Sequence, residues 1–279
     1  MFPIHENLKG KVAVITGGSG VLCSAMAKEL GRQDVKVAIL NRTLEKGQKV
    51  ADEINHSGGE AIAIAANVLE TDTLYKAKEQ IINRYGKIDI LINGAGGNHP
   101  DAITSEETYG PDEKAEKAFF DLKEEGFSKV FDSNFTGSFL ACKVFGDALL
   151  EQSGSTILNI SSMSAYAPMT KVPAYSAAKA AINNFTMWLS VHFANTGLRV
   201  NAIAPGFFLT TQNENLLLDE NGGHTSRAKK IINNTPMERF GDPNDLIGTL
   251  LWLVDSDYSG FVTGVTIPVD GGFMAYSGV

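Results

Sequence analysis

The stretch that decides the fold is KVAVITGGSGVLC, residues 11–23, which joins an apolar run to a glycine-rich turn and then to a helical pattern. Glycines let the backbone turn tightly and approach a ligand closely, and the free amide groups at a helix N-terminus favour phosphate. A tight turn that binds nothing could contain the same glycines. Because the turn at Thr16–Cys23 stands between a first strand and a first helix, the context that a dinucleotide fingerprint requires, we predict that it binds phosphate.

Beyond this turn, short apolar runs alternate with longer amphipathic stretches. The runs are rich in Val, Ile and Ala and lack a polar face, as expected of strands buried on both sides. They are Val12–Thr16, Val35–Leu40, Ala61–Ala66, Ile88–Asn93, Thr156–Ser161, Val200–Ala204 and Val265–Val269. Helical patterns lie between them, for example at Leu44–His56, Thr71–Tyr85, Ser176–Asn195 and Pro243–Asp255. The repetition predicts an α/β fold, a doubly wound (Rossmann) seven-stranded parallel sheet that forms a single domain over residues 1–279.

Two long segments interrupt this alternation, Gly96–Glu124 and Phe207–Phe240, and both follow predicted strands. Ligands of open parallel sheets bind beyond the carboxyl ends of the strands. We therefore expect loop insertions at about 97–124 and 207–240 to lie over the active site and to act as lids or specificity elements. The alternative is that they are solvated surface decoration.

The composition narrows the classes of protein that need to be considered. The formal net charge of −8 argues against nucleic acid and anionic membranes as partners, because both favour a basic face. Cys23 and Cys142 are far apart and show no ligand spacing, so we expect neither a disulfide framework nor a metal site. The sequence shows no signal peptide and no apolar run long enough to span a membrane, which predicts a cytoplasmic protein.

The second predicted strand ends in Asn41 and Arg42. An acidic residue at this place would bind both ribose hydroxyls and repel a 2′-phosphate, which favours NAD. Asn41 is neutral and Arg42 could pair with the 2′-phosphate of NADP, although a solvated arginine at a strand end is also a good interpretation. The sequence predicts NADP(H) or NAD(H) as cofactor and slightly favours NADP.

Tyr175 and Lys179 lie four residues apart in a helical pattern and therefore share one helix face. A phenol with an ordinary pKa near 10 is a poor base at neutral pH unless a nearby cation stabilises the phenolate, and Lys179 is such a cation. Ser162 follows a predicted strand, where its hydroxyl could hold a substrate oxygen. A tyrosine and a lysine at this spacing are common in helices, but the added serine and the nucleotide-binding context favour proton transfer chemistry.

With these residues in view, the chain resembles the short-chain dehydrogenase/reductase family over nearly its whole length. The motifs occur in the family's order. They are the turn at Thr16–Cys23, Asn67-Val68, Asn93-Gly94-Ala95-Gly96, Asn134 in Ser133-Asn134-Phe135, Ser162, Tyr175, Lys179, Arg199–Gly206 with Thr210, and Val269-Asp270-Gly271-Gly272. The resemblance implies an NAD(P)-dependent oxidoreductase that moves a hydride between nicotinamide and a carbonyl or secondary alcohol carbon.

The resemblance also implies roles for single residues. Tyr175 would exchange a proton with the substrate oxygen, which Ser162 would polarise. Lys179 would lower the tyrosine pKa and bind the nicotinamide ribose, and Asn134 would hold a water in a proton relay that reaches Lys179. The implied cofactor-binding residues are Gly17, Ser19, Gly20, Val21, Leu22, Asn41, Arg42, Asn67, Val68, Asn93, Gly94, Ala95, Pro205, Gly206, Phe208 and Thr210.

The chain departs from the family pattern around the cofactor. The family's turn reads Thr-Gly-x-x-x-Gly-x-Gly, but Val21 and Cys23 stand at its second and third motif glycines. Val21 would crowd the pyrophosphate unless the turn is reshaped. Asn67 replaces the usual aspartate, and Gly94 replaces a second asparagine. Because the catalytic set is intact, we interpret these changes as tuning of the cofactor site.

Candidate substrate residues are Asn98, His99, Lys171 and Met163. Asn, His and Lys suit a hydroxyl-rich anionic substrate. Lys171 could instead be solvated, and His99 could only cap its loop. The glycine turn and the sequence Gly97-Asn98-His99-Pro100 also resemble, more weakly, the D-mannonate oxidoreductase (fructuronate reductase) branch of the family. That resemblance implies reversible reduction of D-fructuronate, with the carboxylate held by Lys171 or His99.

Several alternatives remain open at this point. The enzyme could reduce another sugar acid such as 5-ketogluconate, or a 3-oxoacyl thioester. A protein of another class, a non-catalytic nucleotide-sensing regulator, would not need the intact catalytic residues. The family resemblance further implies a homodimer or homotetramer that packs helices at Phe127–Glu151 and Ala174–Asn195. The apolar residues that fit such an interface, or equally the core, are Phe139, Phe145, Phe185 and Trp188.

Overall fold

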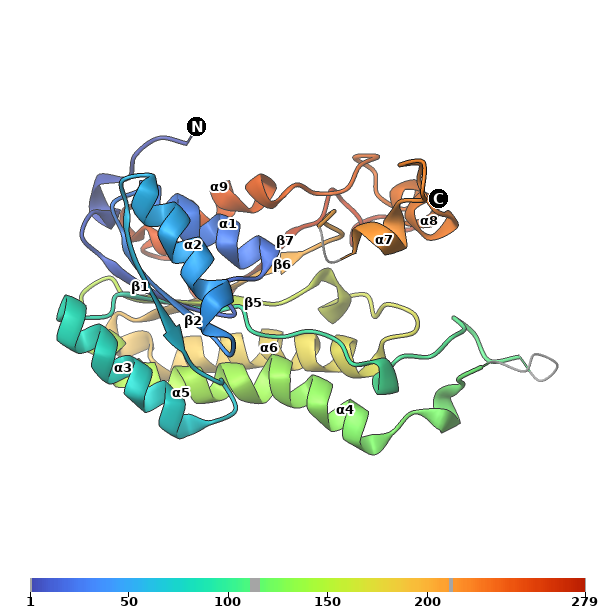
Figure 1. Cartoon of the computed structure of the whole chain (residues 1–279), viewed down its shortest axis with the longest axis horizontal. Coiled ribbons are helices and arrows are strands. Elements are labelled where there is room, and N and C mark those ends of the chain that lie inside the picture. The colour runs from blue at the N-terminus through green and yellow to red at the C-terminus, as the bar shows by residue number, and fades with distance from the viewer. Residues whose placement is uncertain (1, 111–115, 211–212, 279) are drawn as a thin grey trace.

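Seven parallel strands form one sheet in a computed structural model that describes residues 2–110, 116–210 and 213–278 (Figure 1). The strand order is β3-β2-β1-β4-β5-β6-β7. The strands are β1 Val12–Thr16, β2 Lys36–Asn41, β3 Glu60–Ala65, β4 Ile90–Asn93, β5 Thr156–Ile160, β6 Arg199–Pro205 and β7 Thr266–Val269. The order reverses between β1 and β4, where parallel sheets bind their ligands. The doubly wound α/β prediction is confirmed.

Two layers of helices cover the sheet (Figure 1). One face carries α1 Val21–Arg32, α2 Leu44–His56 and α9 Ile247–Val254, and the other carries α3 Thr71–Tyr85, α5 Gly137–Leu150 and α6 Pro173–His192. Along β1, Ala13 and Ile15 join the first core, whereas Val12 and Val14 join the second. Burial on both sides explains why this strand contains no alternating polar residues.

Some predicted helix ends were wrong. Helix α6 begins at Pro173 because proline fits the first helical position, and its last turn gives way to a 3₁₀ turn at Ala194–Thr196. The predicted helix at Pro243–Asp255 is divided into a 3₁₀ turn, Pro243–Leu246, and α9. Asp242 caps that turn by accepting a hydrogen bond from the amide of Asn244.

The two long segments lie on the same side of the molecule (Figure 1). The segment after β4 contains 3₁₀ turns at Pro100–Ala102 and Phe119–Asp121 and leads into α4 Glu124–Phe131. The segment after β6 was expected to be irregular, but it holds α7 Glu214–Leu217 and α8 Ser226–Asn233. Thr225 caps α8, and Ala228 and Ile231 bury one side of it, because residues three apart share a helix face.

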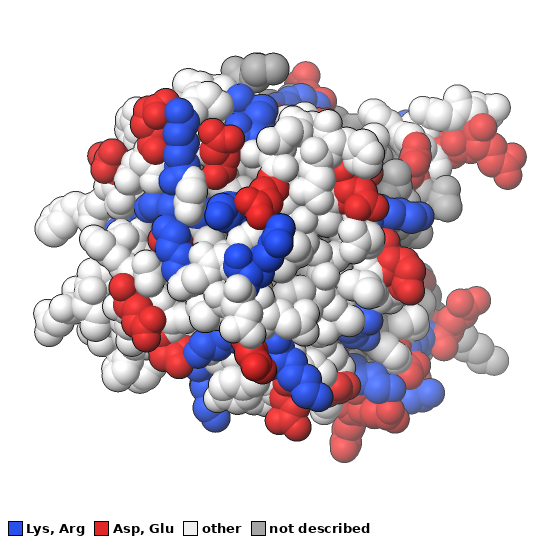
Figure 2. All heavy atoms as spheres, turned by 60° about the vertical axis from the view of Figure 1, so that its left-hand side comes forward, with Lys and Arg blue, Asp and Glu red and all other residues white. Residues whose placement is uncertain are grey.

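The outer surface mixes charges of both signs. On the face shown in Figure 2, basic and acidic side chains are interspersed instead of forming one continuous basic surface. Among the helices of the described residues, none is long and apolar enough to cross a bilayer. Cys23 and Cys142 are both buried free thiols.

Candidate active site

The glycine turn lies at the carboxyl end of β1. Gly17 has a φ of +63°, and a Cβ atom there would lie 2.8 Å from the Cα of Ala95, so this position requires glycine. Gly20 is the N-cap of α1 and offers no side-chain cap. The first amide groups of α1 are therefore left without a side-chain acceptor, an arrangement that favours an anion at the helix start.

Asn41 joins this turn to the end of β2. Its Oδ1 accepts a hydrogen bond from the amide of Ser19 at 3.1 Å, and its Nδ2 donates to Ser19 Oγ at 2.7 Å. The Asn41 amide thus shapes the turn. Arg42 is exposed and forms no ion pair with any residue that the structure describes.

Cys23 and Gly94, two of the departures from the family pattern, have one physical explanation. The side chain of Cys23 is buried, and a Cβ atom at Gly94 would lie 2.1 Å from its Sγ. The thiol therefore occupies the space that a side chain at position 94 would need. The amides of Gly94 and Ala95 instead donate to Thr16 Oγ1 at 3.1 and 3.3 Å, which ties the end of β4 to β1.

The neighbouring positions of α1 face in different directions. Leu22 packs against the core that covers one face of the sheet, and Val21 is half-buried at the first position of the helix. Cys23, which stands at the third motif position, lies against Gly94, the residue that follows β4.

Other predicted cofactor residues have side chains that are engaged within the protein. Asn67 Nδ2 donates to Glu70 Oε1 at 2.7 Å. Val68 packs closely against Gly137, where an added Cβ atom would lie 2.6 Å from Val68 Cγ2. Asn93 is buried and its Nδ2 donates to Asn159 Oδ1 at 2.8 Å. The side chain of Asn93 therefore holds β4 to β5, and any contact with a cofactor would have to come from its backbone.

The predicted cofactor residues after β6 are also held by contacts within the protein. A Cβ atom at Gly206 would lie 2.6 Å from the Cα of Asp270, so β6 and the turn after β7 approach closely where Pro205 ends its strand. Phe208 is buried in the core, and its carbonyl accepts from Asn213 Nδ2 at 2.8 Å. The amide of Thr210 donates to Asn213 Oδ1 at 2.8 Å. Asn213 thus fixes the backbone of this predicted cofactor-flanking stretch.

The fold brings Ser162, Tyr175 and Lys179 together. Tyr175 and Lys179 lie one turn apart on α6, with Lys179 Nζ 5.6 Å from the centre of the tyrosine ring. Lys179 is buried and its Nζ donates to the carbonyl of Ile160, the last residue of β5, at 2.7 Å. Ser162 follows that strand, and its Oγ accepts from the amide of Ser164 at 3.2 Å.

Burial is the main cause of the shifted pKa values of Tyr175 and Lys179. It raises the pKa of the Tyr175 phenol, and a hydrogen bond with the Ser162 hydroxyl offsets part of the increase. The direction differs from the lowered tyrosine pKa that the resemblance implies. Burial also lowers the pKa of Lys179 to about 8. The pKa of the Cys23 thiol is raised to about 11 by burial, with Lys179 acting in the opposite direction.

Asn134 lies in a π-helical turn, Asp132–Thr136, between α4 and α5. Its Nδ2 donates to the carbonyls of Gly97 and Val130, both at 2.7 Å, and a Cβ atom at Gly96 would lie 2.4 Å from its Oδ1. The side chain therefore clamps the chain where it leaves β4, which fits the frequent use of π-turns at functional sites.

The four predicted substrate residues differ in availability. Asn98 is exposed, whereas Met163 is buried in the 3₁₀ turn after Ser162. His99 caps the turn at Pro100–Ala102, where its Nδ1 accepts from the amide of Asp101 at 3.2 Å. Lys171 has a φ of +71°, and its Nζ donates to the carbonyl of Ser105. His99 and Lys171 thus shape the long segment after β4.

Ala102 was not among the predicted site residues, yet it packs with Val130 and Ala174 against Tyr175. An alanine in an irregular segment carries no pattern that would reveal this contact. Through it, the segment after β4 touches the ring of the tyrosine.

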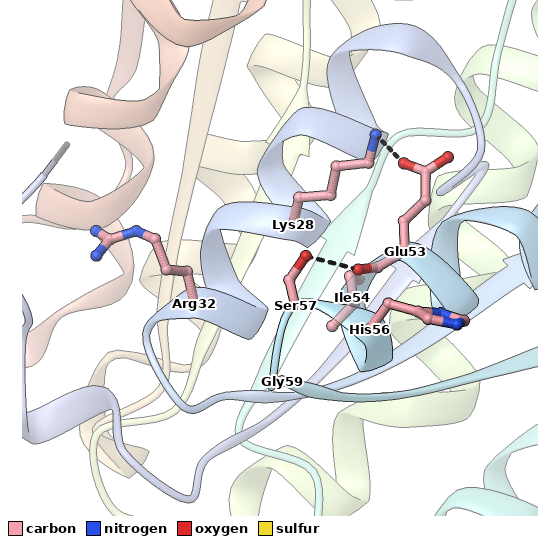
Figure 3. Close-up of a pocket in the computed structure, with 7 residues that line it drawn as sticks. All are labelled: Lys28, Arg32, Glu53, Ile54, His56, Ser57 and Gly59. Atoms are coloured by element: carbon pink, nitrogen blue, oxygen red, sulfur yellow. Dashed lines mark hydrogen bonds and ion pairs between the residues drawn. The ribbon is translucent and has the colours of Figure 1, made fainter.

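A cavity of about 350 Å³ between the C-terminal ends of α1 and α2 lies away from this site (Figure 3). Lys28 pairs with Glu53 at 2.5 Å, and Ser57 Oγ donates to the carbonyl of Glu53 at 2.9 Å. Arg32 points away from these residues in Figure 3 and pairs with Glu29. The polar side chains named here thus already have partners within the protein.

Comparisons with known proteins agree with this geometry. A family model described as short chain dehydrogenase matches residues 11–221. The uncharacterised oxidoreductase UxuB of Bacillus subtilis is 68% identical over 280 residues, 100% of both chains. An uncharacterised oxidoreductase of Haemophilus influenzae is 51% identical over 276 residues, 99% of this chain and 97% of its own. A crystal structure of a proposed D-mannonate oxidoreductase from Haemophilus influenzae with bound NAD is 51% identical, with a TM-score of 0.95 over 98% of each chain.

Proposed function

The chain belongs to the short-chain dehydrogenase family, and from that premise we propose that it reversibly reduces a sugar acid with NAD(H), converting D-fructuronate to D-mannonate. Membership makes it an oxidoreductase. The observation that carries the finer proposal is the structural neighbour described as a D-mannonate oxidoreductase with bound NAD, which shares 51% of its residues with this chain. The sequence resemblance around Gly97-Asn98-His99-Pro100 points to the same substrate.

The residues present fit a nicotinamide dinucleotide. The start of α1 has no side-chain cap, so its first amides can face a pyrophosphate, and the positive φ of Gly17 turns the chain just before them. The backbone of Gly17–Leu22 would hold the pyrophosphate, and Arg42 and Val68 would lie near the adenosine. The sequence slightly favoured NADP. We propose NAD, because the structural neighbour binds it.

The bound cofactor would supply the hydride in reduction and accept it in oxidation. Tyr175 would donate its phenolic proton to the substrate's carbonyl oxygen, which the Ser162 hydroxyl would also hydrogen-bond. A raised pKa keeps the phenol protonated at neutral pH, which suits a proton donor. Lys179 would bind the nicotinamide ribose and stabilise the phenolate that forms. Asn134 would hold the water that returns a proton toward Lys179.

We also propose that the protein is a homodimer or homotetramer that packs α5 and α6 against a second copy. Phe139, Met187, Trp188 and Val191 expose apolar surface on these two helices. Phe145, another candidate for the interface, is fully buried in the core instead, and Phe185 packs against the same core.

The deciding experiment measures NADH and NADPH oxidation by the purified protein with D-fructuronate, 5-ketogluconate and a 3-oxoacyl thioester. We expect the highest kcat/KM with NADH and D-fructuronate. Turnover of a different carbonyl compound, with none of D-fructuronate, would refute the proposed substrate.

The Tyr175→Phe variant tests the chemistry. Loss of the proton donor should lower kcat about 10²- to 10⁴-fold. NADH binding, measured by fluorescence titration, should persist because the ring remains. A Tyr175→Phe variant that keeps wild-type turnover would exclude Tyr175 as the proton donor. A wild-type protein that binds NADH but reduces no substrate would instead favour the alternative of a non-catalytic nucleotide-sensing regulator.

A further inference from the structure

An ion pair joins the two long segments that follow β4 and β6. Lys230 of α8 pairs through its Nζ with Oε2 of Glu107 in the segment after β4. Figure 1 shows α8 and the segment after β4 extending on the same side of the molecule. The contact therefore lies outside the carboxyl ends of the strands, on the side where the catalytic residues are placed.

Two more cations act on the same carboxylate. The hydrogen bond from Lys230 is the main cause that lowers the pKa of Glu107, and the charges of Lys230, Lys171 and Arg227 lower it further. Arg227 precedes Lys230 by one turn of α8 and so shares its face. Lys230 thus contacts this carboxylate directly, and the charges of Lys171 and Arg227 also act on it, in a protein whose net charge is −8.

One of these cations, Lys171, precedes the helix that carries Tyr175 and Lys179. Lys171 lies just before α6, four residues ahead of Tyr175, and its carbonyl accepts from the amide of Thr104 at 3.0 Å. Its Nζ donates to the carbonyl of Ser105, so both ends of this residue hold the segment that carries Glu107. The positive φ of Lys171 is a strained conformation that such contacts maintain.

The pair between Lys230 and Glu107 can be replaced by a ligand. The Lys230 side chain is 63% exposed and that of Glu107 is 38% exposed. Exposed ion pairs contribute little to stability because water solvates both partners well. A carboxylate on a ligand could therefore displace Glu107 at little cost and keep Lys230 paired.

We propose that Lys230 and Arg227, assisted by Lys171, bind the carboxylate of the substrate, and that Glu107 occupies this position in the free enzyme. The inference rests on the proposed function, because it assigns the anionic end of a sugar acid to these residues. It makes α8 a specificity element of the enzyme. A neutral ketose would gain nothing from these cations.

Steady-state kinetics of single charge-removing variants test this inference. Lys230→Gln and Arg227→Gln should each raise KM for D-fructuronate about tenfold, with kcat and the KM for NADH nearly unchanged. Lys229→Gln, an exposed neighbour on the same helix, is the matched control and should behave like the wild type. D-Fructose, which has a hydroxymethyl group in place of the carboxylate, should show the same kcat/KM with every variant.

Glu107→Gln separates this inference from a merely structural role. If Glu107 competes with the substrate, its removal should lower KM for D-fructuronate about threefold. If the ion pair only holds the two segments together, the same change should raise KM for both sugars, which would overturn the inference. Lys230→Gln and Arg227→Gln variants that match Lys229→Gln would also overturn it. A wild-type enzyme that reduces no sugar acid would refute the proposed function, and the inference with it.

Discussion

Around Cys23 and Gly94 there is no room for one additional Cβ atom, whereas around Glu107 and Lys230 the side chains are open to solvent. The first region lies between the glycine turn and β4, and its contacts are buried. The second lies where the two long segments meet. In the first region the side chains must fit a fixed space, so a larger residue at one position requires a smaller residue at the other. The second depends on charge, so single changes should alter substrate binding without disturbing the fold.

Gly94→Asn is the variant expected to have the largest effect on stability. Its Cβ would lie 2.1 Å from Cys23 Sγ and 3.0 Å from the carbonyl oxygen of Thr16, which is backbone and cannot rotate away. Overpacking of this kind should lower the free energy of unfolding by about 3 kcal/mol. Thermal unfolding should show a Tm lower by about 5–10 °C.

A second variant tests the pairing itself. In Gly94→Asn/Cys23→Gly the thiol is absent, so the double variant should be more stable than Gly94→Asn alone. Gly97→Asn is the control, because no atom lies within 4 Å of the Cβ it would add. If the two single effects simply add in the double variant, the steric explanation fails.

The parts of the structure that the sequence predicted well are those set by local pattern. The apolar run Val12–Thr16 must be buried on both faces, and the spacing of Tyr175 and Lys179 places them on one side of α6. Both predictions follow from the periodicity of strands and helices. The order of the motifs identified the family for the same reason, since each motif is short and local.

The parts that could not be predicted depend on contacts between distant residues. Cys23 and Gly94 looked like two separate departures, because nothing in the sequence shows that the thiol occupies the space beside position 94. His99 and Lys171 were predicted as substrate residues, and nothing in the sequence shows that they also cap and pin the segment after β4. Helix α8 is short, and its two buried residues, Ala228 and Ile231, form too small a pattern to stand out.

Ser162 belongs to neither region, and Ser162→Ala should affect catalysis instead of stability or substrate affinity. Its hydroxyl lowers the pKa of Tyr175, so its removal should leave the pKa still higher. Oxidation of D-mannonate needs the phenolate, which forms as pH rises through the tyrosine pKa. The acid limb of that pH–rate profile should therefore move to higher pH, and kcat should fall roughly 30-fold, about 2 kcal/mol.

The control for this variant is Ser164→Ala. The Ser164 hydroxyl is buried and makes no hydrogen bond within the described part of the chain, and only its backbone amide contacts Ser162. Its profile should match the wild type. A Ser162→Ala profile with an unmoved acid limb would show that the serine does not act on the tyrosine.

Lys230→Gln should have the smallest effect on stability, which completes the contrast with Gly94→Asn. Its ion pair with Glu107 is largely solvated, and exposed pairs typically contribute about 0–1 kcal/mol. Urea titration should therefore give a free energy of unfolding within about 1 kcal/mol of the wild type, even though KM for D-fructuronate is expected to rise. A much larger loss would mean that the two long segments stabilise the fold through this contact, and that charge in this region cannot be changed independently of structure.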